Sequence, residues 1–237
     1  MNISPTNIWQ WRAMKSLESA LLVVSMVCGV SYLLAPFFLA EQLRPFWPVN
    51  TIIKGLAVSP LAVIAWRLLK GTSGKLLGLA LVFSSLGDIF LAWRNGNYFV
   101  FGLLSFLVAH LFFIALWVRN WRRPLRVNNN QKLLLAALLL FLLTMLWWML
   151  PVPGLSIPVA VYMCVLTTMV MTSVLVEGRS NWIVSGAILF LLSDTLIALS
   201  TFKQVVGGWQ AGLLIWSTYY LAQYLMTFGL LGRYDEP

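Results

Sequence analysis

The feature that most constrains this chain is a series of long apolar segments. Eight stretches of about 18 to 24 mostly apolar residues follow one another, and a helix of that length crosses roughly 30 Å of hydrocarbon. They cover residues 17–39, 51–69, 76–93, 97–118, 132–150, 155–175, 181–202 and 209–231. The sequence therefore predicts an all-α, polytopic membrane protein with eight transmembrane helices. Residues 1–237 would form a single integral membrane domain.

Composition excludes a water-soluble globule. Sixty per cent of the 237 residues are apolar, only 10% are charged and the mean hydropathy is +0.86, which leaves too little polar surface to face water. The first segment could also be a signal peptide, because Lys15 precedes it and small residues lie near Ala35 and Ala40. It is longer than a typical signal-peptide core, and its removal would leave seven spans, so we interpret it as a membrane helix.

The surplus of nine positive charges follows the positive-inside rule, which makes nucleic-acid binding an unnecessary explanation. Three cations lie in the first, third and seventh loops between the segments: Arg44, Arg94 and Lys203. Twelve flank the second, fourth and sixth loops and the two ends of the chain: Arg12, Lys15, Arg67, Lys70, Lys75, Arg119, Arg122, Arg123, Arg126, Lys132, Arg179 and Arg233. This asymmetry predicts cytoplasmic amino and carboxyl termini. If the protein is bacterial, we expect this multi-pass membrane protein in the inner membrane.

A faint internal repeat runs through the segments. Residues 87–92 (GDIFLA) match residues 193–198 (SDTLIA), and Ala109-His110 resembles Ala222-Gln223. Two four-helix halves in the same orientation would follow, as in membrane proteins built from parallel repeats.

Three charged side chains are expected inside the hydrocarbon: Lys54, Asp88 and Asp194. A charge near the bilayer centre costs at least about 2.5 to 3.5 kcal/mol on insertion scales, so each needs a partner, a wet cavity or a function. Uncharged polar groups accompany them on the later segments: His110, Tyr162, Tyr219, Tyr220 and Gln223. The expected depths allow six of these residues to line one cavity that opens on the non-cytoplasmic side: Lys54, Asp88, His110, Tyr162, Asp194 and Gln223.

Each of these residues also has a structural explanation. Lys54 lies near a membrane edge and could extend its ammonium to the interface. It could instead form a structural ion pair with Asp88. His110 could be a hydrogen-bonded core histidine, and the tyrosines could be packing residues.

Two carboxyl groups in one apolar site favour acid and base chemistry. Low dielectric and mutual repulsion keep one of them protonated near neutral pH. The other can stay ionised beside Lys54. Such a pair suits cleavage of a carbon–oxygen bond through an oxocarbenium-like state.

The chain resembles the YhhN-like membrane proteins, a family that includes the animal lysoplasmalogenases. The resemblance covers the second to the eighth segment, and GAxxFxxSD followed by TYYxAQ is its most specific part. Its residues are Lys54, Pro60, Gly87, Asp88, Ala109, His110, Tyr162, Gly186, Ala187, Phe190, Ser193, Asp194, Thr218, Tyr219, Tyr220, Ala222 and Gln223. One departure is that Pro60 lies six residues beyond Lys54 instead of next to it.

The resemblance implies hydrolysis of the vinyl ether bond of a lysoplasmalogen, which releases a fatty aldehyde and a glycerophospho-base. Asp88 and Asp194 would be catalytic, with neither yet assigned as the acid. Lys54 would bind the lipid phosphate, and His110, Tyr162, Tyr219, Tyr220 and Gln223 would bind or orient substrate. The expected partners are a lysophospholipid substrate and membrane lipid. No cofactor and no metal are expected.

Three other functions stay open. A metal-dependent hydrolase usually needs several His or carboxylate ligands, and this chain has one His. A proton-coupled transporter could use Asp88 and Asp194 as protonation sites. A lipid-binding scaffold would bind without turnover.

Overall fold

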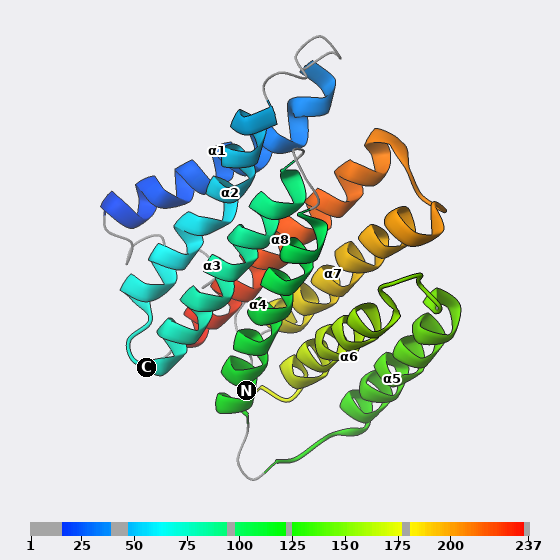
Figure 1. The fold of residues 1–237 in the computed structure, drawn as a ribbon. Helices are drawn as coiled ribbons and strands as arrows, with labels where there is room; N and C mark the ends of the chain where they lie inside the picture. The colour runs from blue at the N-terminus through cyan, green and yellow to red at the C-terminus, as the bar shows by residue number, and fades with distance from the viewer. Residues whose placement is uncertain (1–15, 39–46, 94–97, 122–124, 177–180, 235–237) are drawn as a thin grey trace.

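The structure is a computed structural model that describes residues 16–38, 47–93, 98–121, 125–176 and 181–234. Within these ranges the chain forms eight α-helices and one short π-helix, η4 (Figure 1). Their bounds are α1 Ser16–Phe38, α2 Trp47–Leu68, α3 Thr72–Ala92, α4 Phe99–Arg119, α5 Asn129–Met149, α6 Ser156–Ser173, α7 Asn181–Ala198, η4 Leu199–Lys203 and α8 Gly208–Tyr234. Each predicted segment coincides with one α-helix, give or take a few residues.

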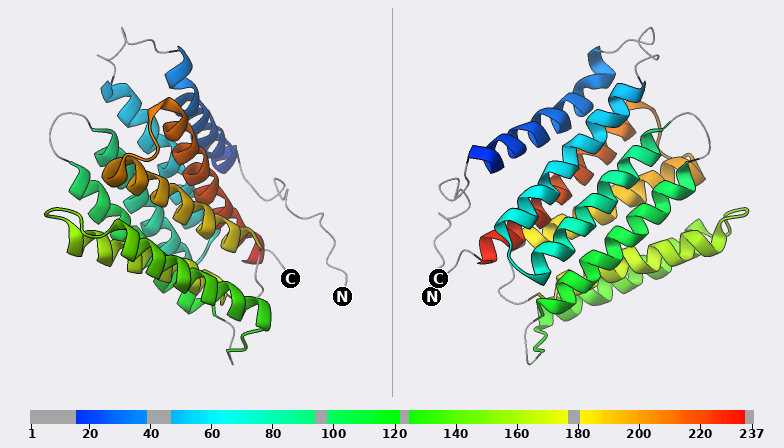
Figure 2. Two further views of the ribbon diagram at one scale, coloured as in Figure 1. Left: turned by 90° about the vertical axis from the view of Figure 1, so that its right-hand side faces the viewer. Right: turned by 60° about the vertical axis from the view of Figure 1, so that its left-hand side comes forward.

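Six of the helices form a closed ring. In order around the ring, α2, α3, α4, α6, α7 and α8 each pack against the next, and α8 returns to α2. The other two helices lie at opposite edges: α1 covers α2 and α8, whereas α5 packs mainly against α6 (Figure 2). The predicted site residues all lie on helices of the ring.

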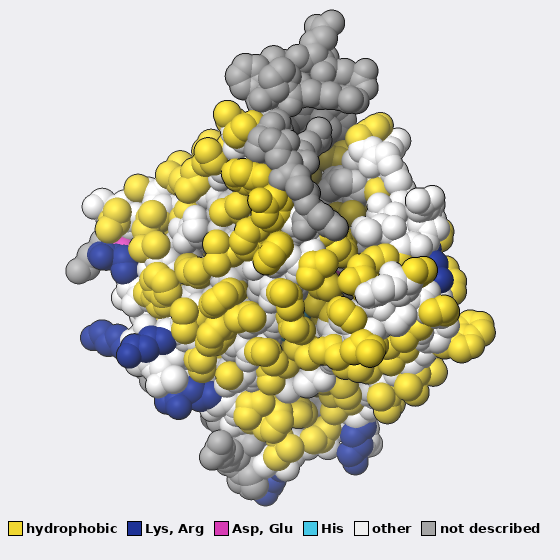
Figure 3. All heavy atoms as spheres, in the orientation of Figure 1, with side chains coloured by type: hydrophobic (Ala, Val, Ile, Leu, Met, Phe, Trp, Pro, Cys, Tyr) yellow, Lys and Arg dark blue, Asp and Glu magenta, His cyan; other side chains and the backbone are white. Residues whose placement is uncertain are grey.

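The all-helical membrane fold is confirmed, and the protein is a multi-pass integral membrane protein. Seven described helices are long and apolar enough to cross a membrane. The eighth, α8, has 27 residues, but Tyr219, Tyr220 and Gln223 make it more polar. Hydrophobic side chains cover most of the face seen in Figure 3, and Lys and Arg lie at its margins. The orientation and the repeat of two four-helix halves stay predictions.

Some of the cations used to predict topology lie outside the described residues. These are Arg12, Lys15, Arg44, Arg94, Arg122, Arg123 and Arg179, together with the side chain of Arg233.

Small residues bring the ring helices close together. A Cβ built on Gly87 would lie 2.6 Å from the Phe106 ring, and one on Gly102 would lie 2.7 Å from Leu91, so α3 and α4 touch at these glycines. A Cβ on Gly186 would lie 2.9 Å from the backbone oxygen of Ala222, which joins α7 to α8. These contacts bring Asp88 and Asp194, on α3 and α7, toward the same interior.

One ion pair, between a buried carboxylate and an exposed guanidinium, was not expected. Glu18 at the start of α1 is 2% exposed, and its Oε1 accepts a hydrogen bond of 2.7 Å from Arg67 Nε near the end of α2. The sequence predicted Arg67 only as a topogenic cation. The pair joins two helix ends on the same side of the bundle.

Candidate active site

The polar residues predicted for the site form two clusters in the interior of the ring. The Asp88 cluster consists of Lys54, Asp88 and Tyr219, from α2, α3 and α8. The Asp194 cluster consists of His110, Tyr162 and Asp194, from α4, α6 and α7. Six of the eight predicted residues therefore belong to one of these two clusters.

In the Asp88 cluster the carboxylate has a different partner on each oxygen. Lys54 Nζ lies 3.3 Å from Asp88 Oδ1, and Tyr219 Oη donates a hydrogen bond of 2.6 Å to Asp88 Oδ2. Asp88 is 1% exposed, so a lone charge there would be costly, and the ammonium offsets it. The ion pair that the sequence left as an alternative is present.

The Lys54 ammonium points into the bundle and away from the membrane edge. Its Nζ lies 5.6 Å from the ring centroids of both Tyr32 and Trp216. Aromatic faces attract a cation, so the two rings and Asp88 together hold the ammonium in place. Extension of Lys54 to the interface does not occur in this structure.

In the Asp194 cluster two side chains approach the same carboxylate oxygen. Tyr162 Oη donates a hydrogen bond to Asp194 Oδ2, and His110 Nε2 lies 3.6 Å from that oxygen. His110 Nε2 also lies 3.1 Å from Tyr162 Oη. His110 is fully buried and its Nδ1 has no hydrogen-bond partner among the described residues. The three groups form a short chain along which a proton can move.

Phe190 separates the two clusters. Its ring centroid lies 4.8 Å from that of His110 and 5.3 Å from that of Tyr219. Phe106 packs edge-on against both Phe190 and Tyr219. The rings of Phe190 and Phe106 therefore lie between the two carboxylates.

The two remaining predicted residues lie outside the clusters. Consecutive helix residues are about 100° apart, so Tyr220 points away from Asp88, toward α1, where its hydroxyl lies 2.9 Å from Ser25 Oγ. Gln223 follows Tyr219 by one turn and is fully buried. Its amide comes near the Tyr219 hydroxyl but makes no hydrogen bond of normal geometry with a described residue.

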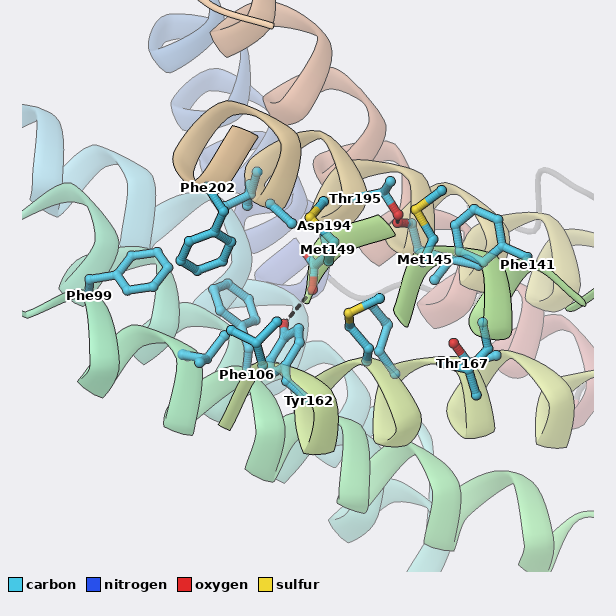
Figure 4. A pocket seen from close by; sticks show the side chains of 18 of the residues that line it. Phe99, Phe106, Phe141, Met145, Met149, Tyr162, Thr167, Asp194, Thr195 and Phe202 are labelled. Carbon is cyan, nitrogen blue, oxygen red and sulfur yellow. Dashed lines mark hydrogen bonds between the residues drawn. The ribbon is translucent and has the colours of Figure 1, made fainter. Parts of the chain in front are cut away.

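An elongated pocket opens beside the Asp194 cluster, with about 740 Å³ of empty space, some of it continuous with the exterior. Its walls come from α3, α4, α5, α6, α7 and η4 and are mostly Leu, Met and Phe. Figure 4 shows Phe99 and Phe202 toward one end, Phe141 and Thr167 toward the other, and the Tyr162–Asp194 hydrogen bond between them. Tyr162 and Asp194 are the predicted site residues that line it. The lining does not include Lys54, Asp88, His110 or Gln223, so this pocket is not the single shared cavity that was predicted from the sequence.

Sequence reasoning missed several residues around the site. Trp216 could have been found, because it shares a helix face with Tyr219 and Gln223 at i, i+3 and i+7. The sequence held no signal for Phe106 or for the residues that α5 adds to the pocket wall, since an apolar residue in a membrane helix is ordinary. Those α5 residues include Phe141, Met145 and Met149. The described residues contain no group of three His, Cys, Asp or Glu that could hold a metal ion.

Comparisons with known proteins agree on one family. The YhhN family model matches residues 49–230. The lysoplasmalogenase TMEM86B of Mus musculus is 34% identical over 208 residues, which is 84% of this chain and 86% of the relative. The human lysoplasmalogenase TMEM86A is 33% identical over 81% of this chain and 86% of its own length.

A bacterial relative agrees with the animal proteins. The lysoplasmalogenase of Mycobacterium tuberculosis is 34% identical over 70% of this chain and 64% of its own length. No solved structure matches the chain. The matched region contains every residue of both clusters, and it follows that this chain belongs to the YhhN family.

Proposed function

We propose that this protein is a lysoplasmalogenase that hydrolyses the vinyl ether bond of an alkenyl lysophospholipid, without a metal ion. The observation that carries the proposal is a carboxyl group, Asp194, that lines a mostly apolar pocket inside a membrane protein. Relatives that bear this enzyme name, at about a third identity over most of the chain, support it.

The two carboxylates suit different roles because their partners differ. Asp194 lines the pocket and, when protonated, can deliver its proton to the vinyl carbon that is not bonded to oxygen. The double-bond electrons form the new C–H bond, and the carbon bonded to oxygen becomes part of an oxocarbenium ion. Asp88 is paired with Lys54 and acts as the ionised carboxylate that stabilises this cation across Phe190.

Water completes the reaction. It adds to the oxocarbenium carbon, and its proton returns to the Asp194 carboxylate, which leaves a hemiacetal. Transfer of the hemiacetal proton to the glycerol oxygen, through Tyr162 and His110, breaks the C–O bond. The products are a fatty aldehyde and a glycerophospho-base, and Asp194 ends the cycle protonated.

The decisive experiment measures aldehyde release from an alkenyl lysophospholipid by detergent-purified protein. Asp194→Asn should lower kcat/KM by about 10²–10⁴-fold, the usual contribution of an acid–base group. Asp88→Asn should lower it by about 10²–10³-fold, the usual effect of losing one electrostatic contact. Size-exclusion chromatography and a melting curve establish that each variant is folded.

Full activity in either Asn variant would refute the roles proposed for the two carboxylates. A chelator should leave wild-type activity unchanged. Loss of activity in the presence of the chelator would point to a metal-dependent hydrolase. Proton-driven uptake of a solute without aldehyde release would favour the transporter, and lipid binding that survives both Asn substitutions without turnover would favour the scaffold.

A further inference from the structure

We infer that the inner half of the pocket is the track of the substrate's hydrocarbon chain and that Leu166, Thr167 and Phe141 limit the chain length that can pass. This inference rests on the proposed function, and it names the residues that select the substrate. The occupant is one alkenyl chain of a lysophospholipid.

The two ends of the pocket differ in their position in the bundle. Phe99 begins α4, Met149 ends α5 and Phe202 lies in η4, so these lining residues lie at one end of the bundle, near the edge of the membrane. Leu166 and Thr167 lie in the middle of α6, and Phe141 lies in the middle of α5. A charged head group stays near the membrane edge because its burial is costly, so the chain points toward Phe141 and Thr167.

Asp194 lies between these ends, which fits the position of the bond that breaks (Figure 4). A vinyl ether lies at the junction of head group and chain. With that bond at the Tyr162–Asp194 hydrogen bond, the head group extends toward Phe99 and Phe202. From Tyr162 to Thr167 the rise along α6 is about 7.5 Å, so the pocket encloses the first several carbons of the chain.

The wall of the inner half is suited to a hydrocarbon. Leu166 is 3% exposed and Thr167 is 1% exposed, so α6 contributes a closely packed side, which we call the rigid side because close packing leaves little room for movement. Opposite them, α5 contributes Phe141, Leu142 and Met145, and the α5 helix packs mainly against α6. Methionine side chains adapt to irregular apolar shapes. Added bulk on the rigid side should therefore obstruct the track more than bulk on α5.

The test uses two neighbouring threonines. Thr167 lines the pocket, whereas Thr168 is exposed on the outer face of α6. Aldehyde release is measured on alkenyl lysophospholipids that share one head group and differ in chain length. Thr167→Phe should lower the ratio of long-chain to short-chain kcat/KM at least about 10-fold, because apolar pockets discriminate by this order per methylene. Thr168→Phe should leave the ratio unchanged.

A second variant tests the same track from the other helix. Phe141→Ala removes a ring from the inner end and should raise the ratio of long-chain to short-chain kcat/KM. The inference would be overturned if Thr167→Phe lowered kcat/KM equally at every chain length. It would also be overturned if the ratio of long-chain to short-chain kcat/KM were unchanged in both pocket variants.

A binding measurement separates this inference from the proposed function. Saturated alkyl-ether lysophospholipids carry the same chain but lack the vinyl group. Long analogues should raise the Tm of the wild type more than that of Thr167→Phe. Stabilisation by these analogues without any aldehyde release from alkenyl substrates would sink the proposed function alone. If wild type releases aldehyde but Thr167→Phe changes neither the chain-length ratio of kcat/KM nor the Tm shift, the inference is wrong and the proposed function stands.

Discussion

At the scale of single residues, each buried carboxyl group of the site has two polar side chains beside it. Asp88 has an ammonium and a phenol, and Asp194 has a phenol and an imidazole. Gln223 is a buried, uncharged polar residue of the site without two such partners among the described residues. Its amide oxygen and nitrogen are buried without a hydrogen bond of normal geometry to a described residue, which costs stability. A group kept at such a cost is a candidate for function.

We therefore predict that Gln223→Met makes the protein more stable and less active. An unsatisfied buried polar group costs about 1–3 kcal/mol, and methionine has a similar volume, so the Tm should rise. Activity should fall because the amide lies beside Tyr219, which orients Asp88. Gln210→Met, on the exposed start of the same helix, should change neither property. A lower Tm for Gln223→Met would show that the amide is satisfied.

At the scale of helices, the motif GAxxFxxSD has a structural explanation along α7. Gly186 allows α8 to approach, Phe190 lies between the clusters, and Ser193 Oγ donates a hydrogen bond of 3.0 Å to Ile215 O on α8. These three contacts hold α7 against α8 while Asp194 faces the pocket. The motif thus joins packing and chemistry on one helix.

Substitution of Gly186 tests this contact between α7 and α8. The Cβ of Gly186→Ala would lie 2.9 Å from the Ala222 backbone oxygen, so α7 and α8 must move apart. Overpacking typically costs about 1–3 kcal/mol, and both Tm and aldehyde release should fall. Gly212→Ala is the matched control, because a Cβ there meets nothing within 4 Å. Equal melting temperatures for the two variants would contradict the close contact.

At the scale of the whole molecule, charge predicts the orientation of the bundle in the membrane. The described cations outside the hydrocarbon lie mostly where α2 meets α3 and where α4 leads to α5: Arg67, Lys70, Lys75, Arg119, Arg126 and Lys132. Lys203 lies at the other end. By the positive-inside rule we predict that the first group faces the cytoplasm and that the pocket rim, the end of the pocket at Phe99 and Phe202, faces the opposite side.

Reporter fusions in a bacterial host test this orientation. Green fluorescent protein fused after Pro237 should fluoresce, and alkaline phosphatase at the same place should be inactive, because the carboxyl terminus is predicted to be cytoplasmic. Alkaline phosphatase fused after Gly154, between α5 and α6, should be active. The reverse pattern would place the pocket rim on the cytoplasmic side.

The sequence by itself determined the helices and which charged residues lie among them. Apolar length alone locates each helix, because the bilayer sets the length that a span requires. Lys54, Asp88 and Asp194 could be found in the same way, because charge in hydrocarbon is rare and costly. These conclusions need no knowledge of which helices are neighbours.

Only the tertiary structure decided which groups meet. It paired Lys54 with Asp88, joined Tyr162 and His110 to Asp194, and turned Tyr220 toward α1. It also built a pocket wall from α5, whose apolar residues look like ordinary lipid-facing positions in sequence. Hydropathy indicates that a helix crosses the membrane, but its neighbours depend on close side-chain packing, to which residues far apart in the chain contribute.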